Sequence, residues 1–144
     1  MAGRPRLIDL SVAQRIGDVL GLTAPVGTEP YMAPEQCEVE RFGELASATD
    51  VWGLGATLYE ALTGEPPFPA DRQRFPQLRH APAPLPRHVP ERLGALVLDC
   101  LSPRPSGRPS LGELSETLEL LVGGLPAPRI SRLRPGGAAR LRRL

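Results

Sequence analysis

Three segments of the chain repeat apolar residues at helical spacing, and they predict most of its regular structure. In residues 48–63, apolar or small residues cover almost the whole circumference, so this helix is expected to be surrounded by protein. Residues 90–101 and 110–122 carry their apolar residues on one face, which predicts two amphipathic, core-facing helices. These faces consist of Leu93, Leu96, Val97, Cys100 and Leu101 in the first, and Leu111, Leu114, Leu118 and Leu121 in the second. The chain is therefore expected to be mainly α-helical, with helices around a buried central one.

Capping signals set the ends of these helices. Ser47 or Thr49 can cap the start of the central helix, and Gly64, followed by two prolines, supplies its stop. Ser110 and Glu113 stand at the spacing of a capping box where the last helix begins. The helix boundaries are therefore predicted from local chemistry alone.

Two glycines lie inside the central helix, at Gly53 and Gly55. Each lowers helix propensity by roughly 1 kcal/mol relative to alanine. That cost makes sense where another backbone passes close to the helix. Both glycines are therefore expected at a close contact between segments.

The remaining segments predict little regular structure. Residues 6–10 form a short apolar run that suits a strand, and residues 11–47 have the composition of a long loop with a short helix near 34–37. Prolines are frequent between residues 66 and 90, where one turn of helix around 71–78 is possible. A loop as long as residues 11–47 inside a compact domain is usually functional or disordered.

The length and charge pattern narrow the class of protein. The 144 residues suffice for one modest domain. No apolar run is long enough to span a membrane, and the basic residues at the start are not followed by the apolar stretch of a secretory signal. The sequence therefore predicts a cytoplasmic protein. Residues 1–128 carry 11 arginines against 16 acidic residues, a net charge of −5, whereas the segment after them carries six arginines and no acid. We interpret residues 123–144 as a basic, disordered tail. Contact of that tail with an anionic surface is the less favoured alternative, and no nucleic-acid partner is expected.

The cysteines and histidines do not indicate a metal site or a disulfide framework. Cys37 and Cys100 lie far apart without Cys-x-x-Cys spacing, so reduced, buried thiols are expected. His80 and His88 stand in the proline-rich stretch and are interpreted as solvated loop residues. Zinc chemistry is therefore not predicted.

Three motifs, in order, resemble those of protein kinases. Residues 26–35 read Val-Gly-Thr-Glu-Pro-Tyr-Met-Ala-Pro-Glu, which is similar to the end of the kinase activation segment. Residues 50–55 read Asp-Val-Trp-Gly-Leu-Gly and resemble the start of the central helix of the larger lobe, and residues 103–110 resemble the closing arginine motif. The resemblance covers residues 6–122 and implies a partial protein-kinase fold. That fold would comprise the C-lobe alone, with a short N-terminal strand, a long activation segment over residues 9–35 and the three helices.

The resemblance assigns roles in catalysis to four positions. Its Gly-Thr form implies serine/threonine specificity, with Gly27 and Thr28 facing the protein substrate. Thr23 is the candidate activating phosphosite, although an unmodified loop residue is an equal alternative. Asp9 falls at the position of the magnesium-binding aspartate, and a carboxylate is the hard ligand that this ion prefers.

Four further positions are implied to be structural. Glu35 and Arg108 would form the family's ion pair between the activation segment and the last helices. Asp50 resembles the residue that accepts hydrogen bonds from the catalytic loop, and Trp52 lies in the apolar segment that would be the hub of the larger lobe. These residues are interpreted as architectural.

Three positions depart from the family pattern. Leu10 replaces the phenylalanine and Ser11 the glycine of the Asp-Phe-Gly motif, and Arg104 replaces the aspartate ahead of Arg108. Leucine is a tolerable apolar exchange, whereas serine restricts the backbone freedom that lets this loop switch. None of these changes removes the resemblance.

The sequence predicts that this chain alone does not transfer phosphate. It contains no Gly-x-Gly-x-x-Gly, no His-Arg-Asp and no lysine, so the resemblance implies ATP and magnesium only in an intact parent, with weak magnesium binding here. A fragment, an alternative start and a kinase whose N-terminal half lies elsewhere remain open. Without the catalytic loop and the helix before it, the 48–63 helix is expected to expose apolar surface, which marks a partner site or an aggregation liability. Expected partners are a protein substrate or that N-terminal half. The alternatives are a non-catalytic, pseudokinase-like interaction module and a small helical domain with coincidental motifs.

Overall fold

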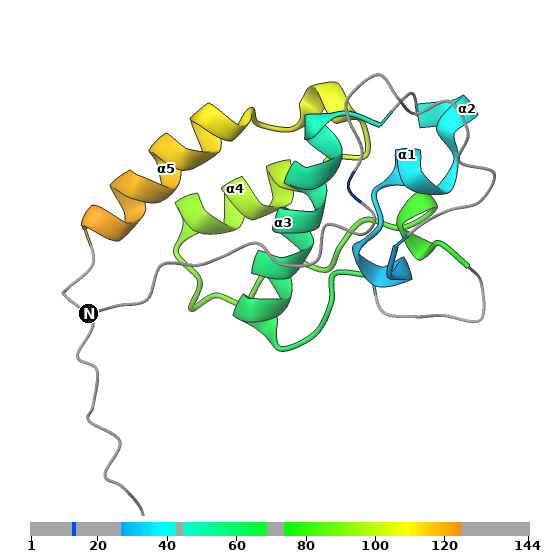
Figure 1. Cartoon of the computed structure of the whole chain (residues 1–144). Coiled ribbons are helices and arrows are strands. Elements are labelled where there is room, and N and C mark those ends of the chain that lie inside the picture. The colour runs from blue at the N-terminus through cyan, green and yellow to red at the C-terminus, as the bar shows by residue number, and fades with distance from the viewer. Residues whose placement is uncertain (1–12, 14–26, 43–44, 69–73, 125–144) are drawn as a thin grey trace, which may run out of the picture.

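The computed structural model describes residue 13 and residues 27–42, 45–68 and 74–124. The predicted strand at 6–10 lies outside them, as do 125–144 of the predicted tail. The described residues form helices and connecting loops, and no strand occurs among them (Figure 1). None of the helices in this part combines the length and the apolarity needed to cross a bilayer.

Five α-helices and three 3₁₀-helices make up the regular structure of the described residues. The α-helices are α1 (Pro34–Cys37), α2 (Val39–Phe42), α3 (Ser47–Thr63), α4 (Glu91–Cys100) and α5 (Leu111–Gly123). The 3₁₀-helices are η1 (Glu29–Tyr31), η2 (Pro76–Leu78) and η3 (Pro105–Gly107). The helix expected around 71–78 is therefore one 3₁₀ turn at its C-terminal end, where Pro76 occupies a first-turn position that needs no N–H donor. Residues 71–73 lie outside the described part.

Helix α3 lies at the centre of the helical assembly. It packs against α4 on one side and against η1 and η3 at other points, and α5 packs against α4 (Figure 1). The core around it consists of Ala33, Trp52, Ala56, Tyr59, Phe68, Val97 and Leu101. A smaller cluster joins α3, α4 and α5 through Val51, Cys100 and Leu114. The segment with apolar residues around its whole circumference is thus the helix on which the others assemble.

One side of α3 departs from the expectation of complete burial. Leu54 is 37% exposed, and Thr57 and Ala61, which follow on the same face, are also exposed. The opposite side carries the buried residues, including Trp52 and Tyr59. Burial all round, expected from composition, is therefore wrong for this stripe within the described structure. The stripe agrees instead with the exposed apolar surface that is expected when the helix lacks its covering neighbours.

The two glycines of α3 differ in their surroundings. A Cβ on Gly55 would come within 2.5 Å of the Cβ of Cys100, so α4 approaches the α3 backbone at this point. A Cβ on Gly53 would meet nothing within 4 Å among the described residues. The expected close approach is confirmed at Gly55, whereas no described residue makes one at Gly53.

The helix ends follow local chemistry with one change. The N-cap of α3 is Ala46, which has no capping oxygen, and its backbone N–H donates to Oγ1 of Thr49 at 3.2 Å. Ser47 is the first helical residue and does not cap. Gly64 ends the helix with φ of 85°, a left-handed conformation that glycine adopts without the steric cost of a Cβ.

The faces predicted for α4 and α5 are buried or half-buried, with one exception. In α4, Leu96, Val97 and Cys100 are buried. In α5, Leu114 is buried, whereas Leu111, the first residue of the helix, is 54% exposed. The capping box at the start of α5 is present, since the Ser110 N–H donates to Glu113 and the Glu113 N–H donates to Oγ of Ser110.

Candidate functional site

The loop that precedes α1 begins with a glycine-only conformation. Gly27 has φ of 144°, and a Cβ there would come within 2.9 Å of Cγ of Met32. Thr28 precedes η1 and its carbonyl accepts the N–H of Tyr31 at 2.9 Å. Gly27 and Thr28 are both exposed, whereas Met32 is buried. The two positions assigned to substrate contact thus lie at the surface, directly ahead of an anchored segment.

That segment is held by side chains from α3 and η2. The hydroxyl of Tyr31 donates to Oε2 of Glu60 at 2.5 Å, and this hydrogen bond to a carboxylate raises the pKa of Tyr31. Nε2 of Gln77 donates to the carbonyls of Glu29 and Met32 at 3.0 and 2.9 Å. The backbone after Thr28 is therefore fixed from two directions.

Sequence reasoning missed both of these anchors. Gln77 is only 3% exposed although it comes from the proline-rich stretch, where nothing in the spacing marks a buried glutamine. Its Oε1 has no hydrogen-bond partner among the described residues. Glu60 was part of the central helix pattern, and its separation of 29 residues from Tyr31 gives no local signal of the pairing.

Glu35 and Arg108, 73 residues apart, meet in a fully shielded ion pair. Nη1 and Nη2 of Arg108 donate to Oε1 and Oε2 of Glu35 at 2.6 and 2.8 Å, and both side chains are 0% exposed. Oε1 of Glu35 also accepts the hydroxyl of Thr49 at 2.9 Å. A bidentate pair of this kind fixes orientation, and its burial makes the loss of either partner costly.

Arg108 uses all five of its N–H donors. Beyond the two bonds to Glu35, it donates to the carbonyls of Ser102, Pro103 and Ala48 at 2.9, 3.3 and 2.9 Å. One side chain thereby ties the start of α1, the start of α3 and the loop after α4 together. The arrangement accounts for a buried cation, because every donor that loses water gains an acceptor.

Trp52 lies directly beside this pair. Its ring stacks on Phe68 with centroids 5.5 Å apart, and the guanidinium carbon of Arg108 lies 5.0 Å from its ring centroid. The side chain is 0% exposed, and its Nε1 has no acceptor among the described residues. The hub residue named from the sequence is thus in the core and in contact with the ion pair.

The other assigned residues do not join this group. Asp50 is exposed near the start of α3 and makes no hydrogen bond or ion pair within the described part of the chain. Asp9 and Thr23 lie outside the described residues. The resolved helices hold no group of three His, Cys, Asp or Glu side chains placed for a metal ion, and the chain has no lysine for a nucleotide phosphate.

The thiols are unpaired in the described structure, as expected. Cys100 is buried, and Cys37 is half-buried beside Gln77, so full burial was wrong for Cys37. Burial is the main cause that raises the pKa of Cys37 to about 12 and that of Cys100 to about 11. Neither thiol is therefore an activated nucleophile. His80 and His88 are exposed.

Comparison with known proteins identifies the family. The family model described as protein kinase domain matches residues 1–118. The serine/threonine-protein kinase PkaA of Streptomyces coelicolor is 36% identical over 84% of this chain and 22% of its own length. Serine/threonine-protein kinase A of Synechocystis is 32% identical over 88% of the chain, and PknB of Mycobacterium leprae 34% over 87%.

The match is long with respect to this chain and short with respect to the relatives. The chain spans about a quarter or less of the length of these three kinases. Residues 1–118, which the family model matches, contain the loop at Gly27, the Glu35–Arg108 pair and the central helix. The chain therefore belongs to the protein kinase family, among the bacterial-type serine/threonine kinases.

Proposed function

We propose that this chain is the C-lobe part of an ATP-dependent serine/threonine protein kinase, a partial kinase domain over residues 1–122. The whole protein would transfer the γ-phosphoryl group of ATP to serine or threonine hydroxyls of a protein substrate. The observation that carries the proposal is the buried Glu35–Arg108 pair. It fastens the end of the loop that begins at Gly27 to the central helix.

The role of this part would be to position the substrate. Gly27 and Thr28 are exposed, while the residues after them are fixed by Glu60 and Gln77. Phosphoryl transfer depends largely on holding the acceptor hydroxyl in line with the phosphate. An exposed Thr28 followed by a backbone that is fixed by hydrogen bonds suits this positioning role. Thr28 would contact the substrate hydroxyl.

ATP and magnesium would be held mainly by residues that these 144 positions do not contain. The sequence has no Gly-x-Gly-x-x-Gly, no His-Arg-Asp and no lysine. Asp9 would be its one ligand for magnesium, and a single carboxylate holds that ion weakly. The chain alone is therefore expected to be inactive, with its N-terminal kinase half as the required partner.

The proposal also assigns a regulatory site and a cellular location to the intact kinase. Thr23 would be the phosphosite that activates the intact kinase, and Asp50 would accept hydrogen bonds from the catalytic loop of the intact domain. The protein would act in the cytoplasm. Residues 123–144 would form a basic tail, for which contact with an anionic surface is the less favoured alternative.

A non-catalytic interaction module is the second candidate. The exposed face of α3, with Leu54, Thr57 and Ala61, favours it, because a largely apolar stripe on the central helix suits contact with another protein surface. On this reading the Glu35–Arg108 pair serves stability alone. Phosphoryl transfer by the whole protein separates the two candidates.

The test is a phosphotransfer assay with labelled ATP, run on the 144-residue chain and on the whole protein that contains it. We expect no turnover by the chain. We expect turnover by the whole protein that is lost in Asp9→Asn and lowered about 100-fold in Thr28→Ala. Thr57→Ala, an exposed threonine on α3, is the matched control and should retain the rate. Robust, Asp9-dependent turnover by the isolated chain, or an inactive whole protein, would overturn the proposal.

A further inference from the structure

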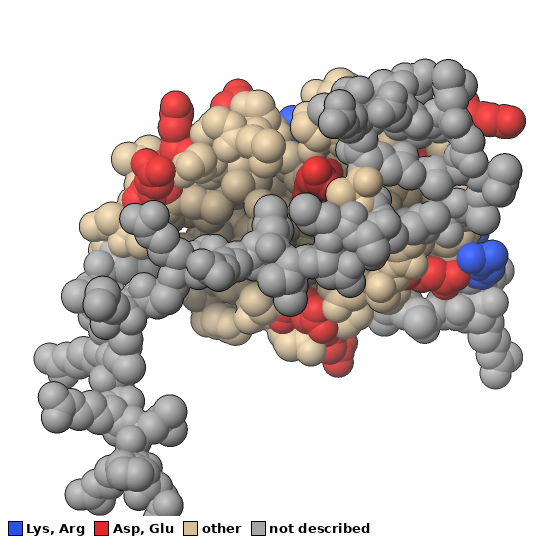
Figure 2. Space-filling view, viewed as in Figure 1, with Lys and Arg blue, Asp and Glu red and all other residues tan. Residues whose placement is uncertain are grey.

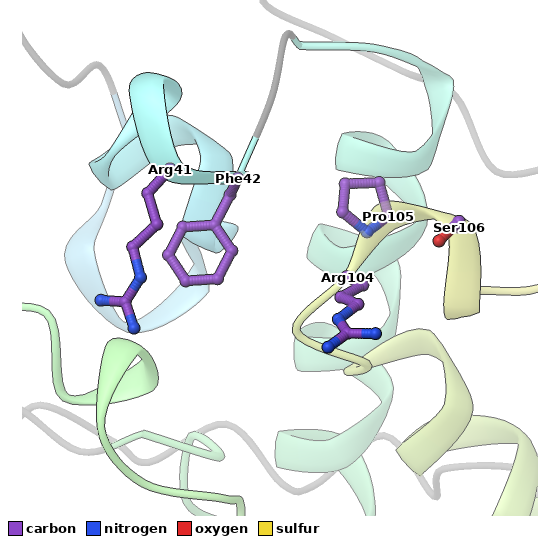
Figure 3. Close-up of a pocket in the computed structure, with 5 residues that line it drawn as sticks. All are labelled: Arg41, Phe42, Arg104, Pro105 and Ser106. Atoms are coloured by element: carbon purple, nitrogen blue, oxygen red, sulfur yellow. The ribbon is translucent and has the colours of Figure 1, made fainter.

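An open pocket lies between α2 and η3, away from the exposed loop at Gly27. It has a volume of about 470 Å³ and is lined by Arg41 and Phe42 from α2 and by Arg104, Pro105 and Ser106 from the η3 segment. Figure 3 shows the two arginines on opposite sides of the gap, with the Phe42 ring beside Arg41. Its volume is in the range of sites that take small molecules or side chains.

The charges in this pocket are largely uncompensated. Arg104 is exposed and has no hydrogen bond or ion pair with the described residues. Arg41 contacts Glu38 at 3.5 Å and covers the Phe42 ring at 5.0 Å, and its side chain remains 65% exposed. The Ser106 hydroxyl has no hydrogen-bond partner within the same part of the chain. Arg104 and the Ser106 hydroxyl thus have no partner among the described residues, and Arg41 uses one of its five N–H donors on Glu38, so all three line the pocket with unused donors.

The pocket stands out from an acidic surface. The described residues carry 7 arginines against 12 acidic residues, a net charge of −5. On the face shown in Figure 2, acidic side chains are spread over the described surface and basic ones appear only at its margins. This balance disfavours extended polyanions on the described part of the chain, whereas the whole sequence has a net charge of +1 because six arginines follow residue 128. A compact anion that reaches only the two arginines fits better.

We propose that this pocket binds a phosphoryl group carried on a protein side chain. A phosphoryl group brings about −1.5 to −2 charges and three strong acceptor oxygens, which match two guanidinium forks and a hydroxyl donor. The Phe42 ring and Pro105 give the site apolar walls for the carbon atoms of the carrying residue. The site is independent of phosphoryl transfer by the parent, because it uses none of the residues assigned to substrate or magnesium.

The experiment is calorimetric titration of the full chain with four probes. These are a phosphothreonine peptide, a phosphotyrosine peptide, the unphosphorylated threonine peptide and inorganic phosphate. We expect one phosphopeptide to bind at least tenfold more tightly than the unphosphorylated peptide and than inorganic phosphate. Equal affinity for inorganic phosphate and both phosphopeptides would overturn the assignment to a protein side chain.

Variants place the binding in the pocket. Arg104→Ala and Arg41→Ala should each weaken phosphopeptide binding about 10- to 100-fold, because each removes charge-assisted hydrogen bonds. Arg92→Ala, an exposed arginine on α4 away from the pocket, is the matched control and should bind as the unchanged chain does. Thermal melting verifies that each variant is folded. Equal affinity in Arg104→Ala and Arg92→Ala would overturn the proposal.

Discussion

The two terminal nitrogens of Arg108 donate hydrogen bonds to the two carboxylate oxygens of Glu35, at 2.6 and 2.8 Å, and neither side chain is exposed to solvent. A buried pair contributes less to stability than its geometry suggests, because both charges lost their hydration on folding. The removal of one partner, by contrast, is strongly destabilising. The remaining charge then stays buried without compensation.

Arg108→Ala should therefore destabilise the chain severely. We expect a loss of about 3–5 kcal/mol in the free energy of unfolding, the range for breaking a buried pair, measured by urea unfolding followed through Trp52 fluorescence. Arg108→Lys should lower the free energy of unfolding less than Arg108→Ala does, because it keeps the charge but not the bidentate contact with Glu35. Arg87→Ala, at an exposed position, is the control and should change stability little. Equal midpoints for Arg108→Ala and Arg87→Ala would contradict a structural role of the pair.

The two glycines of α3 should respond in opposite directions to the same substitution. Gly55→Ala places a methyl group within 2.5 Å of Cβ of Cys100, which forces α3 and α4 apart and should cost about 1–3 kcal/mol. Gly53→Ala meets no described neighbour and should stabilise the helix by about 0.5–1 kcal/mol. Thermal unfolding of the two variants side by side provides the measurement. Shifts of the same sign would contradict the contact described between the helices.

Alkaline pH should weaken the fold through the two tyrosines. The hydrogen bond to Glu60 raises the pKa of Tyr31, and burial raises the pKa of Tyr59. Because these folded-state pKa values lie above the unfolded value of about 10, the stabilisation is complete below that pH and is lost as pH rises through the folded values. Phenolate absorbance during an alkaline titration should therefore appear later in the folded chain than in urea.

A pair of variants isolates the contribution of Tyr31. Glu60→Gln removes the carboxylate that holds the Tyr31 hydroxyl, so the pKa of Tyr31 should fall toward its ordinary value. Glu116→Gln, at an exposed position on α5, is the control and should leave both tyrosines unchanged. With no lysine in the chain, the titration is free of overlapping ammonium groups. An identical first ionisation in both variants would argue against the Tyr31–Glu60 bond.

The two thiols should react slowly while the chain is folded. Burial raises the pKa of Cys100 to about 11 and that of Cys37 to about 12, with Asp99 and Glu35 respectively adding to the shift. Alkylation requires the thiolate, so at about pH 8 labelling should be at least about 100-fold slower than in the urea-unfolded chain. Mass spectrometry of Cys37→Ser and Cys100→Ser variants follows each thiol separately. Rapid labelling of folded chain at that pH would contradict the burial of Cys100 and the acidic surroundings of Cys37.

Local chemistry accounts for much of the helical framework. The Ser110–Glu113 capping box, the stop at Gly64 and the spacing of Leu96, Val97 and Cys100 each act within a few residues, so the sequence alone predicts where α3, α4 and α5 form. The resemblance to kinases also pointed to Glu35 and Arg108 as a pair. In each case the signal is short-range or rests on a motif.

Long-range contacts decided the rest. The bond of Tyr31 to Glu60 and the bonds of Gln77 to the loop at Glu29 join residues 29 to 48 positions apart, and composition says nothing of them. The sequence determined by itself that this chain forms helices of the kinase type with a central apolar one. Only the tertiary structure decided which face of that helix is covered, and that Arg41 and Arg104 line the same pocket. Burial and proximity depend on how the elements pack against one another and not on local spacing.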